Sequence, residues 1–280
     1  MRAFAALVAL AGCAAHQGPG DLAADAATDL TACCALVVPF GQAAVENLST
    51  ALPMLTPIGR DIALRPGHLA QHPAALAVLT DLVQPLDILM VSARQHLTGN
   101  ILPGYFNHAA LVLGAEADLR ALGLWSDPAI LPLQGAVRAG GTVAIEANGS
   151  AVAAVPLART ADADAIAVLR PDLNPTERRA ALRRLAGRIG TPFDFRFDTA
   201  TPDCLFCTEL VDVALPGLHL PQRDVAGRQT IIPDDVARTA LEGGDLSLAA
   251  FLYADRQDWH RGDAALLSAT IAANWPGAAP

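Results

Sequence analysis

The most reactive side chain that the sequence offers is the thiol of Cys207. Apolar residues follow it at helical spacing, at Leu210 and Val213, and Thr201-Pro202-Asp203 before it supplies a cap, a first-turn proline and an acidic residue. This pattern predicts a helix with Cys207 in its first turn or two. A helix N-terminus and a nearby imidazole both favour the thiolate, which is the nucleophilic form of cysteine. Cys207 is therefore the candidate nucleophile.

His108 is the candidate partner of that thiol. It lies in the apolar run 106–114, which predicts a buried strand, and a histidine in such a run is often only a hydrogen-bonded core residue. The remaining histidines lie in segments without a predicted rigid element: His16, His68, His72, His96, His219 and His260. Because a proton-transfer group must be held rigidly, we expect His108 to act as the general base and then the general acid.

Glu146 is the candidate for orienting that imidazole. It lies inside the apolar run 143–147, where an unpaired carboxylate would be costly. As the next predicted strand after the one that carries His108, this run could bring the carboxylate to the far ring nitrogen. The alternatives are a solvated strand residue or an ion pair with an arginine. Asn107 and Asn148 are weaker candidates for the same role.

The other cysteines leave several alternatives open. Cys204 and Cys207 form a Cys-x-x-Cys, but one such pair without a second pair of ligands is a poor zinc signal. Cys204 could form a disulfide with Cys33 or Cys34 in an oxidising compartment, or all three could remain buried thiols. No Gly-x-Ser-x-Gly, Gly-x-Gly-x-x-Gly, P-loop or His-Glu-x-x-His sequence occurs. We therefore expect neither a metal nor a cofactor.

The composition excludes further classes of chemistry. All 19 basic residues are arginine, so Schiff-base chemistry and a phosphate-binding lysine are absent. The formal net charge of -9 provides no basic stripe for phosphates, which argues against a nucleic-acid partner. Hydrophobic residues make up 52% of the chain and charged residues 17%, as in an ordered globular protein.

The N-terminus has the pattern of an export signal. Met1-Arg2 is a short positive region, Ala3 to Leu10 is apolar, and Leu10-Ala11-Gly12-Cys13 resembles the lipobox of bacterial lipoproteins. We expect residues 1–12 to be removed and Cys13 to be lipidated, unless the segment is a plain secretory signal. Ala14 in place of aspartate favours sorting to the outer membrane, facing the periplasm.

The order of predicted elements indicates an α+β fold. Residues 13–29 predict a tether, and residues 30–280 a single domain whose N-terminal part consists of short, proline-interrupted helices. Strands are expected before most helices, and strands grouped beside helices are typical of α+β proteins. The expected strands are 87–91, 106–114, a hairpin of 142–147 and 151–155 joined at Asn148-Gly149, 165–169 and 246–253, with a linker expected around residues 126–141. The expected helices are 174–190, which opens with the capping box Asn174-Pro175-Thr176-Glu177, the Cys207 helix, one from Pro233 to about Gly243 and one over 263–275.

The motifs together resemble the permuted papain-like amidases, the YiiX/YaeF group. These are circularly permuted relatives of NlpC-type cell-wall peptidases and are similar in layout to lecithin:retinol acyltransferases. The resemblance covers about residues 84 to 240. It rests on these motifs: Leu86-Asp87-Ile88-Leu89, Phe106-Asn107-His108-Ala109-Ala110-Leu111-Val112-Leu113-Gly114, Ile145-Glu146-Ala147, Val155-Pro156-Leu157, Val168-Leu169-Arg170-Pro171, Gly190-Thr191-Pro192-Phe193-Asp194-Phe195 and Cys207-Thr208-Glu209-Leu210-Val211.

The resemblance implies a papain-like, NlpC-type fold in permuted order, with a small antiparallel barrel-like sheet packed on the cysteine helix. It also implies Cys207 as nucleophile, His108 as base and then acid, and Glu146 as the orienting residue. Leu86-Asp87 replaces the family's usual Gly-Asp, Asn107 stands where serine or threonine is common, and Cys204 has no counterpart.

The expected function is that of a membrane-anchored cysteine hydrolase of the amidase or peptidase type. It would form an acyl-enzyme with an amide or ester of the cell envelope, such as a peptide, peptidoglycan or a lipid amide. The alternatives are a thiol acyltransferase acting on a lipid or lipopeptide, and a non-catalytic envelope lipoprotein. The sequence ranks neither the substrates nor the oligomeric states.

Overall fold

The computed structural model describes residues 63, 65–95, 104–201, 203–225 and 227–275. The predicted signal peptide, lipidated Cys13, the tether, Cys33 and Cys34 lie outside the described residues. The elements in chain order are η1 (Leu69–Gln71), α3 (Pro73–Leu82), β1 (Ile88–Ser92), β2 (His108–Gly114), α4 (Glu116–Ala121), η3 (Leu131–Leu133), α5 (Gln134–Gly140), β3 (Val143–Asn148), β4 (Ala151–Pro156), α6 (Leu157–Thr160), β5 (Ala165–Pro171), α7 (Pro175–Ala186), α8 (Cys207–Ala214), η4 (Pro216–Leu218), β6 (Arg223–Val225), β7 (Arg228–Thr230), α9 (Pro233–Glu242), β8 (Leu246–Ala254), β9 (Trp259–Gly262) and α10 (Ala264–Ala273).

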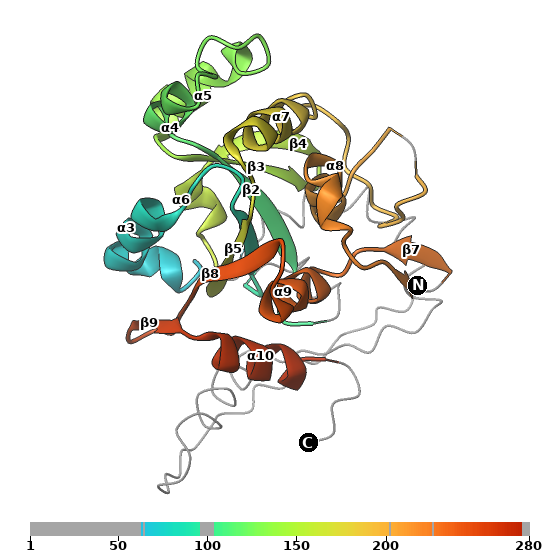
Figure 1. Ribbon diagram of the computed structural model, residues 1–280. Coiled ribbons are helices and arrows are strands. Elements are labelled where there is room, and N and C mark those ends of the chain that lie inside the picture. Colours follow the sequence, from blue (N-terminus) through green and yellow to red (C-terminus); the bar gives the residue numbers. More distant parts are fainter. Residues whose placement is uncertain (1–62, 64, 96–103, 202, 226, 276–280) are drawn as a thin grey trace, which may run out of the picture.

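One antiparallel sheet organises the fold (Figure 1). Its seven strands are ordered β4-β3-β2-β1-β5-β8-β9, and β6 and β7 form a separate hairpin. Strands β1 to β4 are also neighbours in sequence order, so the part of the sheet that carries His108 and Glu146 is a local meander. The α+β class predicted from the sequence is confirmed.

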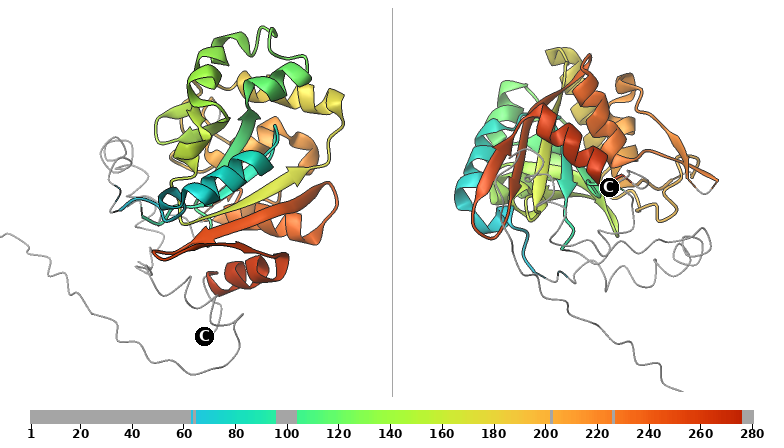
Figure 2. Two further views of the ribbon diagram at one scale, coloured as in Figure 1. Left: turned by 90° about the vertical axis from the view of Figure 1, so that its left-hand side faces the viewer. Right: turned by 90° about the horizontal axis from the view of Figure 1, so that it is seen from below.

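The two faces of the sheet bury two separate apolar clusters. Along β1 the side chains alternate, so Ile88 and Met90 belong to one cluster and Leu89 and Val91 to the other. Helices α7, α8, α9 and α10 contribute buried residues to the first cluster, and α3 and α6 to the second. Figure 2 (left) shows this division, with α3 in front of the strands and the orange helices α8 and α9 behind them.

The strong sequence patterns gave elements close to those expected. The Asn148-Gly149 pair connects β3 to β4, whose residues pair from Val143↔Pro156 to Asn148↔Ala151. Asn174 caps α7 by accepting hydrogen bonds from the amides of Thr176 and Glu177, as the capping box predicts. The linker expected around residues 126–141 instead contains η3 and α5, and the sequence did not predict α4, β6, β7 or β9.

The predicted start of the cysteine helix was wrong. Thr201 and Asp203 do not cap α8, because the helix begins at Cys207 and Asp203 has a left-handed φ of +63°. Leu205 is extended instead: its amide donates to the carbonyl of Pro192 at 2.9 Å, and its carbonyl accepts from the amide of Asp194 at 3.1 Å. Pairing with this distant loop prevents Leu205 from joining the helix.

Leu86 occupies the position where a glycine was expected. Its φ of +72° lies in the left-handed region, yet its side chain is fully buried in the first cluster. Next to it, buried Asp87 accepts two hydrogen bonds from the guanidinium of Arg170, at 2.8 and 2.6 Å. This two-point ion pair connects the start of β1 to β5.

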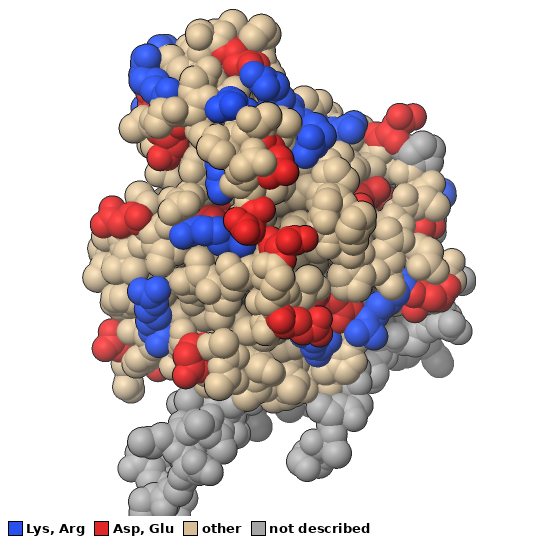
Figure 3. Space-filling model, in the orientation of Figure 1, with Lys and Arg blue, Asp and Glu red and all other residues tan. Residues whose placement is uncertain are grey.

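The surface on the helix side mixes both signs of charge. Figure 3 shows arginines over α4, α5 and α7 with acidic side chains among them. Three of these arginines form ion pairs, Arg120 and Arg138 with Glu116, and Arg183 with Asp127. Within the described part of the chain, no helix has the length and apolar character needed to cross a bilayer.

Candidate active site

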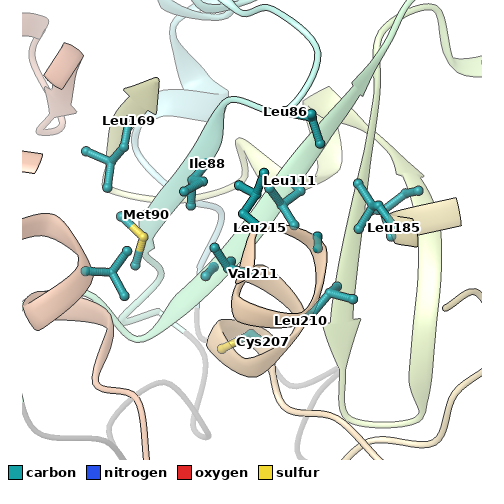
Figure 4. Packing of buried hydrophobic residues seen from close by; sticks show 14 of the residues in the cluster. Leu86, Ile88, Met90, Leu111, Leu169, Leu185, Cys207, Leu210, Val211 and Leu215 are labelled. Carbon is teal, nitrogen blue, oxygen red and sulfur yellow. The ribbon is translucent and has the colours of Figure 1, made fainter. Parts of the chain in front are cut away.

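Helix α8 places Cys207 at its first position, against the sheet. The preceding residue, Phe206, is extended, and its amide donates to the Glu209 carboxylate at 3.3 Å. Leu210 and Val211 are fully buried and pack α8 onto β2 and β3, as Figure 4 shows. Cys207 forms no disulfide and is 3% exposed, so its thiol is almost completely buried.

Strands β2 and β3 bring His108 and Glu146 together. Leu111 of β2 pairs with Ile145 of β3, and stepping along this antiparallel register makes His108 and Glu146 diagonal neighbours on one face. His108 Nε2 lies 3.2 Å from Glu146 Oε2. The histidine side chain is 23% exposed and the glutamate side chain 8%, so little water reaches the glutamate.

Three side chains donate hydrogen bonds to the Glu146 carboxylate. Besides His108, these are Asn148 Nδ2, 2.7 Å from Oε1, and Thr160 Oγ1, 3.3 Å from Oε2. Burial raises the pKa of this carboxyl group, but the three hydrogen bonds and the charge of His108 outweigh burial and lower the pKa to about 2. Glu146 is therefore a carboxylate throughout the physiological pH range.

The imidazole of His108 has the Cys207 thiol as its second side-chain partner. Burial lowers the pKa of the ring, whereas hydrogen bonds to Cys207 and Glu146, and Coulombic interactions with both, raise it to about 10. The ring is therefore cationic at neutral pH. Since Nε2 faces Glu146, Nδ1 is the nitrogen left to exchange a proton with the thiol. An imidazolium beside a thiol favours the thiolate.

A second buried carboxyl group lies on the nucleophile helix. Glu209, two residues after Cys207, is 7% exposed. Burial raises its pKa to about 7, the hydrogen bond from Phe206 opposes this, and the negative charges of Asp194, Asp212 and Asp198 add to it. This carboxyl group is therefore partly protonated at neutral pH.

The other candidates from the sequence lie elsewhere or act differently. The Asn107 side chain accepts a hydrogen bond from the amide of Ala93 at 3.0 Å, and so anchors the chain next to His108. Asn148 contacts the glutamate, not the histidine. Cys204 is half-buried, and burial together with Asp194 and Glu209 raises the pKa of its thiol. Thr160 was missed, because a single threonine at the end of a four-residue helix carries no sequence signal.

The described residues contain no group of three or more histidine, cysteine, aspartate or glutamate side chains arranged to hold a metal ion. The reactive groups that the structure brings together at this site are a thiol, an imidazole and a carboxylate. A thiol at a helix start beside an imidazole and a third, orienting group is the arrangement of papain-like cysteine hydrolases. In papain itself the cysteine precedes the histidine in the sequence, whereas here His108 precedes Cys207, which is the permuted order.

The comparison with protein families agrees with this class. The family described as permuted papain-like amidase enzyme, YaeF/YiiX, C92 family, matches residues 83–261. The chain therefore belongs to the permuted papain-like amidases, and the fold expected from the resemblance is confirmed. The match continues past about residue 240, where the resemblance ended, and includes β8 and most of β9. No curated protein and no solved structure matched the chain.

Proposed function

We propose that this chain is a cysteine amidase or peptidase in which Cys207 is the nucleophile, His108 the general base and acid, and Glu146 the residue that orients His108. The observation that carries the proposal is the position of the His108 ring, which has Cys207 as one partner and Glu146, at 3.2 Å, as the other. Each of the three residues comes from a different regular element.

The first half-reaction forms an acyl-enzyme. The Cys207 thiolate adds to the carbonyl carbon of an amide or ester, which gives a tetrahedral oxyanion. As the intermediate collapses, the C–N or C–O bond breaks, and the leaving amine or alcohol takes the proton of the His108 imidazolium. A thioester on Cys207 and a neutral His108 remain.

The second half-reaction restores the enzyme. Neutral His108 accepts a proton from water, and the resulting hydroxide adds to the thioester carbonyl. The C–S bond breaks, the carboxylic acid leaves, and the thiolate and imidazolium are formed again. The Glu146 carboxylate supports every step at which His108 is cationic.

The start of α8 supports stabilisation of the oxyanion. The first four amides of a helix have no acceptor within the helix, and the positive end of the helix dipole lies there. The amide of Cys207 is the first of these in α8. It would donate a hydrogen bond to the oxyanion while the same residue's sulfur is bonded to the carbon.

The N-terminal sequence supports a proposal for where the substrate is located. We propose that lipidation at Cys13 anchors the enzyme in the outer membrane, facing the periplasm, so that it acts on an amide or ester of the envelope. The support is the Leu10-Ala11-Gly12-Cys13 sequence after a short apolar region. Globomycin should cause the precursor to accumulate, and unchanged processing would contradict lipidation.

The catalytic proposal is tested by iodoacetamide labelling together with hydrolysis of peptide, peptidoglycan and lipid-amide substrates. Cys207→Ala should abolish hydrolysis, and mass spectrometry should locate the fast-reacting thiol at Cys207 in the wild type. Adding amine or alcohol acceptors separates hydrolysis from acyl transfer. If Cys207→Ala leaves every detected hydrolytic activity unchanged, the proposal is wrong.

A further inference from the structure

The segment Ile231–Asp234, at the start of α9, contacts both the nucleophile helix and the histidine strand. We infer that this segment, called here the α9 brace, is a positioning element that sets the placement of Cys207 relative to His108. The inference rests on the proposed roles of those two residues. It assigns a function to residues that lie outside the proposed catalytic set.

The first contact of the brace is with the residue that follows the nucleophile. Thr208 Oγ1 donates a hydrogen bond to the carbonyl of Ile231 at 2.7 Å. Both side chains are 1% exposed, so water cannot replace this bond without opening the core. The contact fixes the first turn of α8, and with it the backbone of Cys207, relative to α9.

The second contact is with the residues that lead into His108. The Asp234 carboxylate accepts the amide of Tyr105 on Oδ2 and the amide of Phe106 on Oδ1, both at 2.8 Å. Asp234 is fully buried. His108 follows Phe106 by two residues, so this two-point contact fixes the entry of β2, and with it the starting position of the imidazole.

The chain around this contact is shaped to receive the carboxylate. Gly104 has a φ of +108°, and a Cβ placed there would lie 2.4 Å from Asp234 Oδ2. Only glycine therefore allows the backbone to approach the carboxylate so closely. On the other side of the segment, Ser92 Oγ donates to the carbonyl of Tyr105 at 2.9 Å. The lead-in to His108 is held from both α9 and β1.

The neighbouring aspartate shows that these contacts are specific to Asp234. Asp235 is also buried, but its carboxylate forms ion pairs with Arg223 and Arg238 and takes no part in the histidine strand. Burial raises the pKa of Asp234 to about 6 against its two amide hydrogen bonds, so the group is mainly a carboxylate at pH 7.5. Two adjacent carboxylates thus hold different parts of the molecule.

The expected consequence is loss of thiolate reactivity without loss of the fold. Misplacement of a reacting group by about 1 Å can reduce a rate about 100-fold. In Asp234→Asn, the amide nitrogen would face one of two backbone amides that both need an acceptor. In Thr208→Val, the shape is retained but the hydrogen bond to Ile231 is lost. Both changes would let the Cys207–His108 geometry relax.

The test measures the rate of iodoacetamide alkylation at Cys207, located by mass spectrometry, from pH 5 to 10 on the full chain. We expect Asp234→Asn to lower the rate at pH 7.5 about 10- to 100-fold, and Thr208→Val to lower it by a smaller factor. Asp235→Asn is the matched control: its melting temperature should fall, and its alkylation rate per folded molecule should stay within about twofold of wild type.

Reference variants separate the two proposals. If His108→Ala alkylates at the wild-type rate, the proposed catalytic pair is wrong. If His108→Ala is slow while Thr208→Val and folded Asp234→Asn both react at the wild-type rate, only the brace is wrong. If Asp234→Asn does not fold, Thr208→Val decides alone. An alkylation rate equal to wild type from pH 5 to 10 in that variant overturns the inference.

Discussion

The pKa values of two buried glutamates near the proposed nucleophile are shifted in opposite directions. Glu146 is 6% exposed and Glu209 is 7% exposed, so burial raises the pKa of both by itself. The pKa of Glu146 nevertheless falls to about 2 and that of Glu209 rises to about 7. The difference shows that the partners of a carboxylate, rather than its exposure, decide its charge here.

The partners explain the roles that we propose for the two regions. Glu146 receives three side-chain hydrogen bonds, one of them from a cationic ring, whereas Glu209 receives a backbone amide and faces other acidic groups. In the proposed mechanism, a permanent charge at Glu146 would help to hold His108 as imidazolium. A partly neutral Glu209 would reduce the negative charge close to Cys207 while still capping α8.

Glu146→Gln should have the largest effect. The pKa of His108 should fall from about 10 towards its ordinary value, because the carboxylate that stabilises the imidazolium is gone. Without an imidazolium beside it the thiol should regain an ordinary pKa, so the rising side of the pH profile of Cys207 alkylation should move to higher pH, and the rate at pH 7 should fall about 30-fold. An unchanged profile would contradict the role of Glu146, and the half-buried, ion-paired Glu116→Gln serves as the control.

Removing the other donors to Glu146 should have a smaller effect. Thr160→Val and Asn148→Ala each delete one hydrogen bond, and the pKa of Glu146 should rise because burial is then less opposed. Glu146 stays charged at pH 7, but it would be held less firmly against His108, so we expect each change to lower the alkylation rate at pH 7 about three- to tenfold, as about 1 kcal/mol predicts. Thr80→Val removes a similar hydroxyl hydrogen bond on the exposed side of α3 and should leave the rate unchanged. An equal loss of rate in Thr80→Val would show that the effect is not specific to the hydrogen bonds of Glu146.

Glu209→Gln should change stability rather than chemistry. The folded pKa of Glu209 is about 7 against an ordinary value of 4.5, so its contribution to stability is fully present below pH 4.5 and is lost as the pH rises through 7. Glutamine stays neutral and can still accept the amide of Phe206. The variant should melt a few degrees above wild type at pH 8.5 and at nearly the same temperature at pH 4.5. A difference in melting temperature that is the same at both pH values would contradict the raised pKa of Glu209.

Asp212→Asn should have the smallest effect. Its charge is one of those that raise the pKa of Glu209, so its removal should lower that pKa by a fraction of a unit. The pH at which the melting temperature begins to fall should move down by the same amount. Asp81→Asn, on the exposed side of α3, should leave that pH unchanged, and a shift there would show a general effect of net charge.

The sequence predicted elements where a local pattern decides the structure. Apolar runs gave β1, β2 and β5, the Asn-Gly pair gave the β3–β4 connection, and the capping box gave α7. The start of α8 was wrong because it depends on the pairing of Leu205 with Pro192, which lies outside any local window.

The candidate site divides in the same way. Cys207, His108 and Glu146 could be selected because each is a reactive group in an apolar or helical pattern. Thr160 and Asp234 could not, since their importance lies in contacts with residues 14 and about 130 positions away. Pro233-Asp234-Asp235 was interpreted only as a helix start, which it is, and its carboxylate proved to face the histidine strand.

The position of the α9 brace has a consequence for biosynthesis. Ribosomes and export channels deliver a chain from its N-terminus, and here His108, Glu146 and Cys207 all emerge before Ile231–Asp234. A nascent or truncated chain that ends before residue 231 would thus carry every proposed catalytic residue but not the contacts that align them. Under these two proposals, Cys207 would stay unaligned with His108 until residues 231–234 have also been delivered.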